Sequence, residues 1–399
     1  MKFLMLNARY YPDIHGGGDK SIQFLAEGLV EDGHEVTVLA TSKDGKFHEY
    51  NENGVKVVKI KLWNTYWFPP SKPQNIIKKL IWHFLDIYNP FMKKSVSSII
   101  RREKPDIIHS HALDGFSTSA WDVAKKENIP VVHTLRGYKL LCPNATMFSN
   151  GKNCENQCFK CFIYSYRQKK VSEKVDGVIG ISNYVLNSHI KLGFFRNSRT
   201  IRIFNAFKPV ESPKRRGSRK KYNKIRFGYF GRIHPTKGIE LILEVLNFLE
   251  EDTYELFLGG SGNGEYIEKL KSETLDKPVV FLGQISPESF FSKIDFLLAP
   301  SIWNEPLGRV VLESFNFGVP VIGSNRGGIP EMIDDSKNGF LFNPDNKTEL
   351  INILRNINRM DNWENLQENA IKSSKRFLPS EIIRQHNQFY KLIIKNNKK

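Results

Sequence analysis

The chain has 399 residues, of which 40% are hydrophobic and 25% charged. This balance is typical of a globular protein, and the length allows two domains. No apolar run reaches the roughly 18 residues that a membrane-spanning helix needs, and residues 1–9 have too short an apolar core for a signal peptide, so we expect a cytoplasmic protein. The formal net charge of +17 predicts a polyanion or an anionic surface as a neighbour.

Predicted strands and helices alternate along the N-terminal half. The segment 21–31 is expected to be a helix with Ile22, Leu25, Ala26 and Leu29 on one face. Strands are expected at 2–7, 35–41, 107–110, 131–135 and 177–181. This alternation predicts a parallel sheet with crossover helices.

Three glycines, Gly16, Gly17 and Gly18, lie between the first strand and the first helix, which is the place for a phosphate-facing loop. Their spacing is not G-x-G-x-x-G, and no acidic residue follows at the distance of a dinucleotide ribose contact, which argues against an NAD enzyme. The alternative is a plain flexible turn. At the end of strand 107–110, His109 and His111 share a face, and such a pair is able to bind metal.

Residues 61–102 combine basic and aromatic side chains. They contain eight Lys or Arg against one acid, Asp86, and eight aromatics. The part at 76–84 is predicted to form a basic amphipathic helix, with Trp63, Trp67, Trp82 and Phe91 nearby, a composition typical of a segment at a membrane interface. The alternative is a solvated helix that covers the edge of the first domain.

All four cysteines fall within 20 residues: Cys142, Cys154, Cys158 and Cys161. The spacing C-x11-C-x3-C-x2-C fits tetrahedral thiolate ligation, and disulfides are not expected in a cytosolic protein. We therefore predict a structural zinc site, with an iron–sulfur cluster or four independent reduced thiols as alternatives.

The run 208–226 carries nine Lys or Arg against one acid, together with Pro209, Pro213 and Gly217. It interrupts the alternation and is predicted to be an interdomain linker, either a solvated loop or a contact for an anion. A second series of strands follows, at 225–229, 254–258, 279–282, 296–299 and 319–322. We expect a second doubly wound domain, with ligands in a cleft where the strand ends of the two domains face each other.

Two basic residues and two glutamates stand out in the second half. Arg232 and Lys237 follow the first strand of this half and are able to neutralise a diphosphate. Glu305 lies in a predicted strand-to-helix loop and Glu313 within the helix at 309–317. At roughly 1.5 Å of rise per residue they are about 12 Å apart along the axis. That is too far for a glycosidase pair and suits two hydroxyl clusters of one long ligand.

These motifs resemble those of the retaining family 4 glycosyltransferases, which have the GT-B fold. The resemblance rests on the E-x7-E run from Glu305 to Glu313, on the G-R-x4-K-G run from Gly231 to Gly238, and on the G-G-x-P-E turn at 327–331. It covers essentially the whole chain and is strongest at 225–345. It implies an α/β protein of two Rossmann-like doubly wound domains facing a central cleft.

The resemblance also implies the domain limits and the roles of particular residues. We expect an N-terminal acceptor-side domain at 1–207, a basic linker at 208–224, a nucleotide-sugar-binding domain at 225–378, and a helix at 379–399 that packs back on the N-terminal domain. The expected catalytic residues are His111, Arg232, Lys237 and Glu305. The expected substrate-binding residues are Gly17, Gly18, Arg136, Gly260, Gln284, Ile285, Leu307, Gly308 and Glu313.

Some of these roles are specific. Glu313 is expected to bind the ribose and Glu305 the donor sugar. His111 is expected to contact a sugar, and the backbone near Gln284 the nucleobase, whereas His109 is expected in the core. Many relatives have His-Asp where this chain has Arg136-Gly137, so Arg136 is expected to bind an anionic acceptor such as a lipid diphosphate.

The sequence thus predicts a glycosyltransferase that needs no cofactor for catalysis. It is expected to use a nucleotide diphosphate sugar and a glycan or lipid-linked acceptor in surface polysaccharide or lipopolysaccharide synthesis, at the inner face of the cell membrane. A nucleotide-sugar-binding pseudo-enzyme, a sugar phosphorylase and a basic nucleic-acid-binding protein are the alternatives. The last is disfavoured because the basic residues concentrate in an edge segment and a linker, and no nucleic-acid motif is present.

Overall fold

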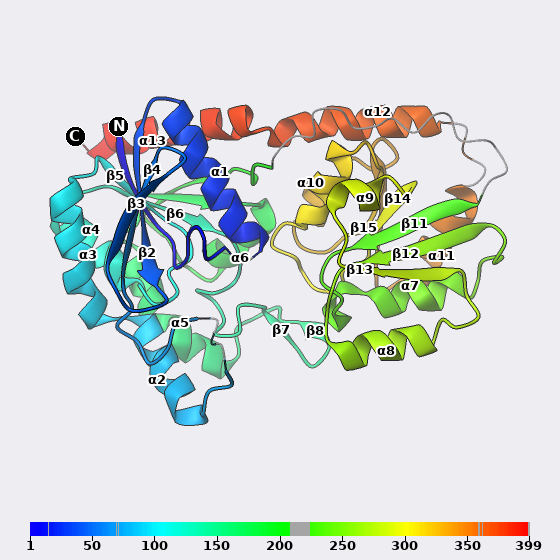
Figure 1. Ribbon diagram of the computed structural model, residues 1–399, viewed down its shortest axis with the longest axis horizontal. Helices are drawn as coiled ribbons and strands as arrows, with labels where there is room; N and C mark the ends of the chain where they lie inside the picture. The colour runs from blue at the N-terminus through cyan, green and yellow to red at the C-terminus, as the bar shows by residue number, and fades with distance from the viewer. Residues whose placement is uncertain are drawn as a thin grey trace. The chain divides into compact units, whose positions relative to one another are not determined.

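The computed structural model describes residues 1–14, 16–68, 70, 72–207, 224–357, 360 and 362–397. The chain forms two compact units (Figure 1). Unit 1 comprises Met1–Met147, Cys154–Ala206 and Pro379–Lys399, and unit 2 comprises Phe148–Asn153 and Phe207–Leu378. Almost all of the predicted linker 208–224 lies outside the described residues.

Unit 1 is built on an eight-stranded sheet of order β10-β9-β6-β5-β1-β2-β4-β3. Its strands are β1 (Lys2–Leu6), β2 (Glu35–Ser42), β3 (His48–Glu52), β4 (Val55–Lys61), β5 (Ile107–Ser110), β6 (Val131–Leu135), β9 (Gly177–Gly180) and β10 (Arg199–Arg202). Every pair is parallel except β3 and β4. The prediction of a parallel sheet is therefore confirmed, but the edge hairpin β3–β4 was missed.

Seven helices accompany this sheet in the described part of unit 1. They are α1 (Gly17–Glu31), α2 (Ile76–Ile87), α3 (Pro90–Glu103), α4 (Ser119–Lys126), α5 (Phe159–Ser172), α6 (Asn183–Lys191) and α13 (Pro379–Asn397). In α1, the expected apolar face is buried, with exposures of 0–2% at Ile22, Leu25, Ala26 and Leu29. The predicted start at residue 21 was wrong, since α1 begins at Gly17.

The last helix, α13, belongs to unit 1. It packs on α1. It also lies close to β9, where a glycine leaves room for its side chains. A Cβ atom at Gly177 of β9 would lie 2.8 Å from Phe389 and 2.9 Å from Ile393, two apolar side chains of α13. The chain therefore returns to its first unit after completing the second.

Unit 2 has a fully parallel six-stranded sheet of order β13-β12-β11-β14-β15-β16. Its strands are β11 (Ile225–Phe230), β12 (Tyr254–Gly259), β13 (Val279–Gly283), β14 (Phe296–Ala299), β15 (Val321–Ser324) and β16 (Gly339–Phe342). Its helices are α7 (Ile239–Leu246), α8 (Gly264–Ser272), α9 (Pro287–Phe291), α10 (Arg309–Asn316), α11 (Lys347–Ile357) and α12 (Trp363–Ser374). The strand order reverses between β11 and β14, as in a doubly wound fold.

Three expectations for local structure were wrong. The strand expected at 319–322 is β15 at Val321–Ser324. For α10 the sequence predicts an inward face at Val310, Val311, Ser314 and Phe317. The structure buries Val311 and Ser314 but leaves Val310 and Phe317 only partly buried, and Leu312 and Phe315 complete the buried face. Trp82 is 1% exposed and donates its Nε1–H to the Tyr66 carbonyl at 3.1 Å, so it anchors α2 and does not face a membrane.

The chain passes to unit 2 after Ala206, close to the limit expected at residue 207, but the N-terminal domain expected at 1–207 is not continuous. A short hairpin, β7 (Phe148–Ser149) and β8 (Lys152–Asn153), is embedded in the sequence of unit 1 but belongs to unit 2. The reason is local: the Asn153 side chain hydrogen-bonds to the backbone of unit 2, as described below.

Candidate functional site

The predicted residues of unit 2 gather at one edge of its sheet. Because the strands are parallel, the loops that follow them lie at the same edge. Arg232 and Lys237 follow β11, Gly260 follows β12, Gln284 and Ile285 follow β13, and Glu305, Leu307 and Gly308 follow β14. Glu313 lies in the second turn of α10. The structure therefore brings nine candidates from five segments of the chain to one region.

Two of these candidates are in direct contact. The Lys237 ammonium lies 2.7 Å from Oε1 of Glu305, and the two side chains are only 19% and 15% exposed. Lys237 also lies over the Trp303 ring, 5.5 Å from its centroid. An ammonium group has three N–H donors, so Lys237 retains the capacity to bind a phosphate oxygen beside the carboxylate.

The second glutamate of the motif is held by its own helix. Nε of Arg309, in the first turn of α10, donates to Oε1 of Glu313 at 2.9 Å. Gly308 forms the N-cap with φ 85°, a backbone conformation that favours glycine. The Val311 N–H of the first turn donates to the Gly308 carbonyl at 2.9 Å, and the positive end of the helix dipole at this N-terminus favours an anion nearby.

Two glycines allow neighbouring strand-end loops of unit 2 to pack closely against each other. A Cβ atom at Gly260, where φ is 139°, would lie 1.8 Å from the Gly231 carbonyl oxygen. A Cβ atom at Gly327, where φ is 60°, would lie 2.1 Å from the carbonyl oxygen of Glu305. That same oxygen accepts the Gly328 N–H at 2.8 Å. The glycine turn after β15 therefore fixes the backbone that carries Glu305.

The loop after β11 has a positive potential. Burial, with help from the charges of Arg232 and Lys237, lowers the pKa of His234 below its usual value. This imidazole is therefore neutral at physiological pH, and Arg232 and Lys237 supply the positive charge of the loop. Burial raises the pKa of Tyr229, whose hydroxyl donates to the Arg232 carbonyl at 2.6 Å and holds that loop.

Asn153 is a functional candidate that the sequence did not reveal. Its amide Nδ2 donates to the Ile302 carbonyl at 2.8 Å, and its Oδ1 accepts the Asn304 N–H at 2.8 Å. The hairpin β7–β8 thus holds the segment immediately before Glu305. Asn153 lies beside Cys154 and follows an Asn150-Gly151 turn, but its partners lie about 150 positions away, so the sequence did not link it to Glu305.

In unit 1, the two histidines differ as expected. Their ring centroids are 4.0 Å apart, consistent with a shared face. His109 is paired at both nitrogens, with Thr134 Oγ1 and the Tyr390 hydroxyl, each at 2.7 Å. His111 is 3% exposed, and its Nε2 has no hydrogen-bond partner among the described residues. Burial lowers the pKa of His111 well below its usual value, so this imidazole is neutral. A sugar contact by His111 stays a prediction.

Arg136 lies just after β6 and is already engaged. Its Nη1 donates to Oδ1 of Asn205 at 2.6 Å, and its Nη2 lies 3.5 Å from Nδ1 of His111. The structure therefore links two of the predicted residues of unit 1 and adds Asn205 to them. The anionic acceptor expected at Arg136 stays a prediction.

Gly17 and Gly18 form the first turn of α1, after the N-cap Gly16. A Cβ atom at Gly16 or Gly18 would meet nothing within 4 Å. Gly16 and Gly18 are exposed, and a ligand contact at this turn stays a prediction. The first turn also contains Asp19, which receives the Arg9 guanidinium at 3.1 Å.

None of the four cysteines forms a disulfide; Cys142 and Cys161 are buried and Cys158 is exposed. Cys158 is the N-cap of α5, and the backbone N–H of Cys161 lowers the pKa of its thiol. Burial raises the pKa of Cys154 and Cys161. Within the described ranges, no three His, Cys, Asp or Glu side chains form a group that could hold a metal ion. The structural zinc site stays a prediction.

Comparisons with known proteins agree with this geometry. The family model "Glycosyltransferase Family 4" matches residues 15–209, and "Glycosyl transferases group 1" matches residues 211–377. An uncharacterised 42.6 kDa protein in the cps region of Klebsiella pneumoniae is 32% identical over 332 residues, covering 83% of this chain and 87% of its own length.

Solved structures share the fold over nearly the whole chain. The sucrose-phosphate synthase of Thermosynechococcus elongatus has a TM-score of 0.74 at 18% identity and covers 99% of both chains. HepE of Anabaena, in complex with UDP, has a TM-score of 0.69 at 19% identity, covering 98% of this chain and 100% of its own. With its two doubly wound units and its strand-end motifs, the chain belongs to the group 1, family 4 glycosyltransferases of the GT-B fold.

Proposed function

We propose that this glycosyltransferase is a retaining enzyme that moves a hexose or a related sugar from a nucleotide diphosphate sugar to an acceptor hydroxyl. The contact between Lys237 and Glu305 supports the proposal most directly. It joins a phosphate-binding cation to a hydroxyl-binding carboxylate, and these two groups are needed at the two sides of the sugar–phosphate bond.

The donor is assigned to the strand-end loops of unit 2. Arg232 and Lys237 bind the diphosphate, Glu313 accepts from the ribose hydroxyls, and Glu305 accepts from the hydroxyls of the donor sugar. The amides of Leu307 and Gly308 add hydrogen-bond donors to phosphate and sugar. The turn at Gly260 and the backbone at Gln284 and Ile285 line the nucleotide. Structures of HepE contain UDP or UDP-glucose, which supports a nucleotide sugar as the donor.

The proposed transfer step depends on the charge that develops on the leaving phosphate. As the bond from the sugar C1 to the phosphate oxygen breaks, negative charge builds on that oxygen, and Lys237 and Arg232 stabilise it. The acceptor oxygen forms a bond to C1 on the same face, and the leaving phosphate oxygen takes the acceptor proton. These two cations suffice for the leaving group, so we expect no cofactor in this step. His111 contacts the sugar with its neutral imidazole.

A glycan or a lipid-linked saccharide is the acceptor that fits best. The Klebsiella relative is named for a cps region, which favours a role in surface polysaccharide synthesis at the inner face of the cell membrane. Arg136 at the end of β6 is expected to bind the anionic part of such an acceptor.

The first experiment is a panel of UDP, GDP, ADP and TDP sugars, scored by thermal shift and by slow release of nucleotide diphosphate. A true donor raises the melting temperature by mass action and is slowly hydrolysed. Binding without hydrolysis, even after candidate acceptors are added, would favour a nucleotide-sugar-binding pseudo-enzyme. The departure at Arg136-Gly137 is the observation behind that alternative. No binding by any sugar would contradict the proposed donor site.

A further inference from the structure

Two helices of unit 1, α2 and α5, expose many large apolar side chains. The helices contact each other, and the His83 and Tyr164 rings meet edge to face at 6.5 Å between them. The exposed fractions of the outward side chains lie between 45% and 77%. This apolar patch consists of Ile76, Ile77, Leu80, Ile81 and Phe84 of α2 and Phe159, Phe162, Ile163 and Tyr166 of α5.

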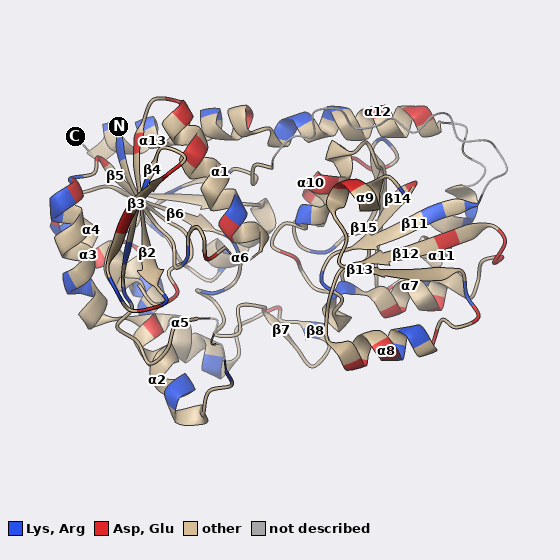
Figure 2. Cartoon of the chain, viewed as in Figure 1, with Lys and Arg blue, Asp and Glu red and all other residues tan. Residues whose placement is uncertain are grey.

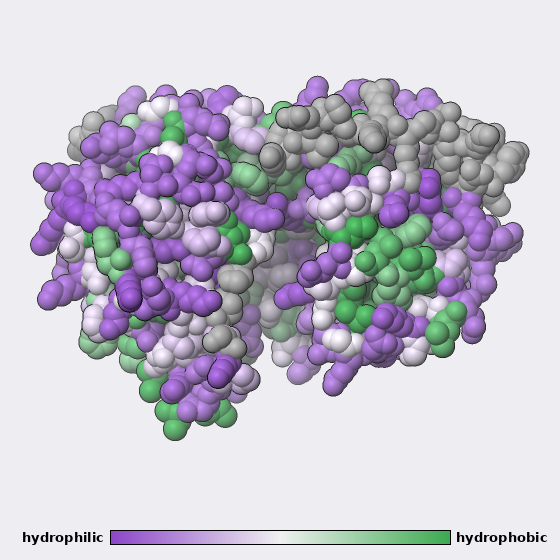
Figure 3. Space-filling view, in the orientation of Figure 1, coloured by the Kyte–Doolittle hydropathy of each residue, from purple (hydrophilic) through white to green (hydrophobic). Residues whose placement is uncertain are grey.

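The spacing along each helix makes the patch continuous. In α2 the residues recur at i, i+1, i+4, i+5 and i+8, and in α5 at i, i+3, i+4 and i+7, so each set forms one stripe. Figure 3 shows apolar colour at the free end of unit 1, over α2. A solvent-exposed apolar cluster of this kind marks an interaction surface.

The opposite face of α2 is firmly held. Trp82 is buried, and Oδ1 of Asp86 accepts the Gly115 N–H at 2.8 Å. Lys139 pairs with the other oxygen of Asp86 at 3.1 Å. The apolar stripe is therefore presented by an anchored helix and cannot turn inward to be buried in the core of unit 1.

Within α2 and α5, every charged side chain other than the buried Asp86 is basic. α2 contributes Lys78 and Lys79, and α5 contributes Lys160, Arg167, Lys169 and Lys170. The sequence of α5 contains no Asp or Glu, and the acid of α2 is the buried Asp86. Figure 2 shows the basic positions along α2. Long basic side chains beside an apolar stripe are able to reach the headgroup level while the stripe enters the acyl region.

We propose that the patch docks the protein on a bilayer that contains anionic lipid. The proposal concerns binding at the bilayer surface, and no helix in the described part of the chain is long and apolar enough to span a membrane. A second copy of the chain fits less well. A two-fold interface through the same patch would bring the lysines of α2 and α5 of both copies together, and like charges repel.

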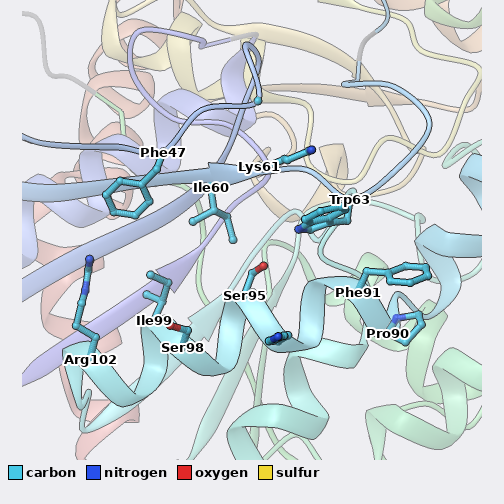
Figure 4. Close-up of a pocket in the computed structure, with 12 residues that line it drawn as sticks. Phe47, Ile60, Lys61, Trp63, Pro90, Phe91, Ser95, Ser98, Ile99 and Arg102 are labelled. Atoms are coloured by element: carbon cyan, nitrogen blue, oxygen red, sulfur yellow. The ribbon is translucent and has the colours of Figure 1, made fainter.

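A groove lined by residues that flank α2 in the sequence also combines apolar and basic side chains. It has a volume of about 850 Å³ and lies between the β4 end and α3 (Figure 4). Trp63, Phe91 and Ile99 supply apolar walls, and Lys61 and Lys94 supply charge. None of its lining residues is acidic. An apolar groove with basic lining fits a lipid better than it fits a protein surface with mixed charges.

Vesicle cosedimentation tests the proposal without any measurement of sugar transfer. The probes are vesicles of phosphatidylcholine alone and of phosphatidylcholine mixed with phosphatidylglycerol. The test variant is Ile77→Gln/Leu80→Gln/Phe84→Gln, since glutamine is a good helix former. The matched control is Phe248→Gln, which removes an aromatic side chain of unit 2 that is 52% exposed. A second variant, Lys78→Gln/Lys79→Gln, tests the charge.

We expect the wild-type protein to prefer the anionic vesicles by about tenfold and to lose binding at high salt. The triple variant should lose about tenfold of that binding, the lysine variant should lose the preference for anionic lipid, and the control should bind like the wild type. Equal melting temperatures would show that all variants are folded. Absence of binding by the wild type, or binding by the triple variant at the wild-type level, would overturn the proposal. So would a dimer in sedimentation equilibrium that the triple variant abolishes.

Discussion

At the scale of single residues, the contact between Lys237 and Glu305 is the centre of the site. Lys237→Ala removes a cation that stabilises the leaving group, so the barrier to transfer should rise by about 2–4 kcal/mol. Initial rates of nucleotide release measure this effect. The matched control is Lys269→Ala, an exposed lysine of unit 2 that pairs with Glu240 at 2.7 Å. A surface pair of this kind contributes little, so an equal loss in both variants would contradict the assignment.

Asn153 should act as a positioning residue. Asn153→Ala frees the segment before Glu305, and we expect kcat to fall about tenfold, or about 1.4 kcal/mol in the barrier. The KM for the donor should change much less, because the side chain is not expected to touch the ligand. Asn153→Asp still accepts from the Asn304 N–H but no longer donates to the Ile302 carbonyl, so its kcat should fall between the two. A change confined to the melting temperature would show a structural role alone.

The four thiols should differ in reactivity. The pKa of Cys158 is lowered by backbone N–H groups at the start of α5, whereas burial raises the pKa of Cys161. Because the thiolate is the nucleophile, iodoacetamide near neutral pH should alkylate Cys158 first, as read by peptide mass spectrometry. Protection of Cys158 that EDTA removes would support the predicted zinc site. Earlier labelling of Cys154 would contradict the order.

At the scale of elements, the packing of α13 against β9 depends on a glycine, Gly177, which has no side chain to occupy the contact. Gly177→Ala places a methyl group within 3 Å of Phe389 and Ile393, and overpacking of this kind typically costs about 1–3 kcal/mol. We expect the free energy of unfolding of unit 1 to fall by that amount in urea denaturation. The control is Gly264→Ala at the start of α8, where a Cβ atom meets nothing within 4 Å. It should be neutral or slightly stabilising.

The sequence predicted some elements well because of their burial. Strands such as β5 and β6 are buried on both faces, and buried parallel strands are nearly continuous apolar runs. The start of α1 was missed because Gly17 and Gly18 are poor helix formers whose position is set by the loop before them. The edge hairpin β3–β4 had a signal that was not used. Its turn, Asn53-Gly54, has positive φ at both residues, as the type I′ turn requires.

The candidate site was only partly predictable. The strand-end positions of Arg232 and Glu305 follow from the alternation of strands and helices together with the family motifs. The partner of Lys237 depends on how two loops 68 residues apart fold against each other. The Asn150-Gly151 turn, with positive φ at both residues, is a signal for the hairpin β7–β8, but the hydrogen bonds of Asn153 reach a segment about 150 positions away. Contacts of this kind are set by tertiary packing, so periodicity and spacing do not encode them.

At the scale of the whole molecule, buried histidines should make stability depend on pH. Burial lowers the pKa of His133 to about 3 and that of His189 and His386 to about 4. The unfolded chain binds these protons near pH 6.5. Between pH 6.5 and about 4 the unfolded state therefore binds more protons, and stability falls as the pH falls.

The size of this effect can be measured. Each group contributes up to about 1.4 kcal/mol per pH unit in that window, so urea denaturation at pH 7.5 and at pH 5 should show a clear loss of stability. His189→Leu removes one of these groups and should reduce the loss. A protein that is as stable at pH 5 as at pH 7.5 would contradict the burial of these imidazoles.

The path of the chain has a consequence for its synthesis. The chain passes from one unit to the other after Met147, Asn153, Ala206 and Leu378. Unit 1 begins first on the ribosome, yet it lacks α13 until Pro379–Lys399 has been made. Unit 2 has all of its segments when Leu378 has emerged. Unit 2, which starts second, can therefore finish folding first. The β1–β5 side of unit 1 can be covered by α13 only after the rest of the chain has been synthesised.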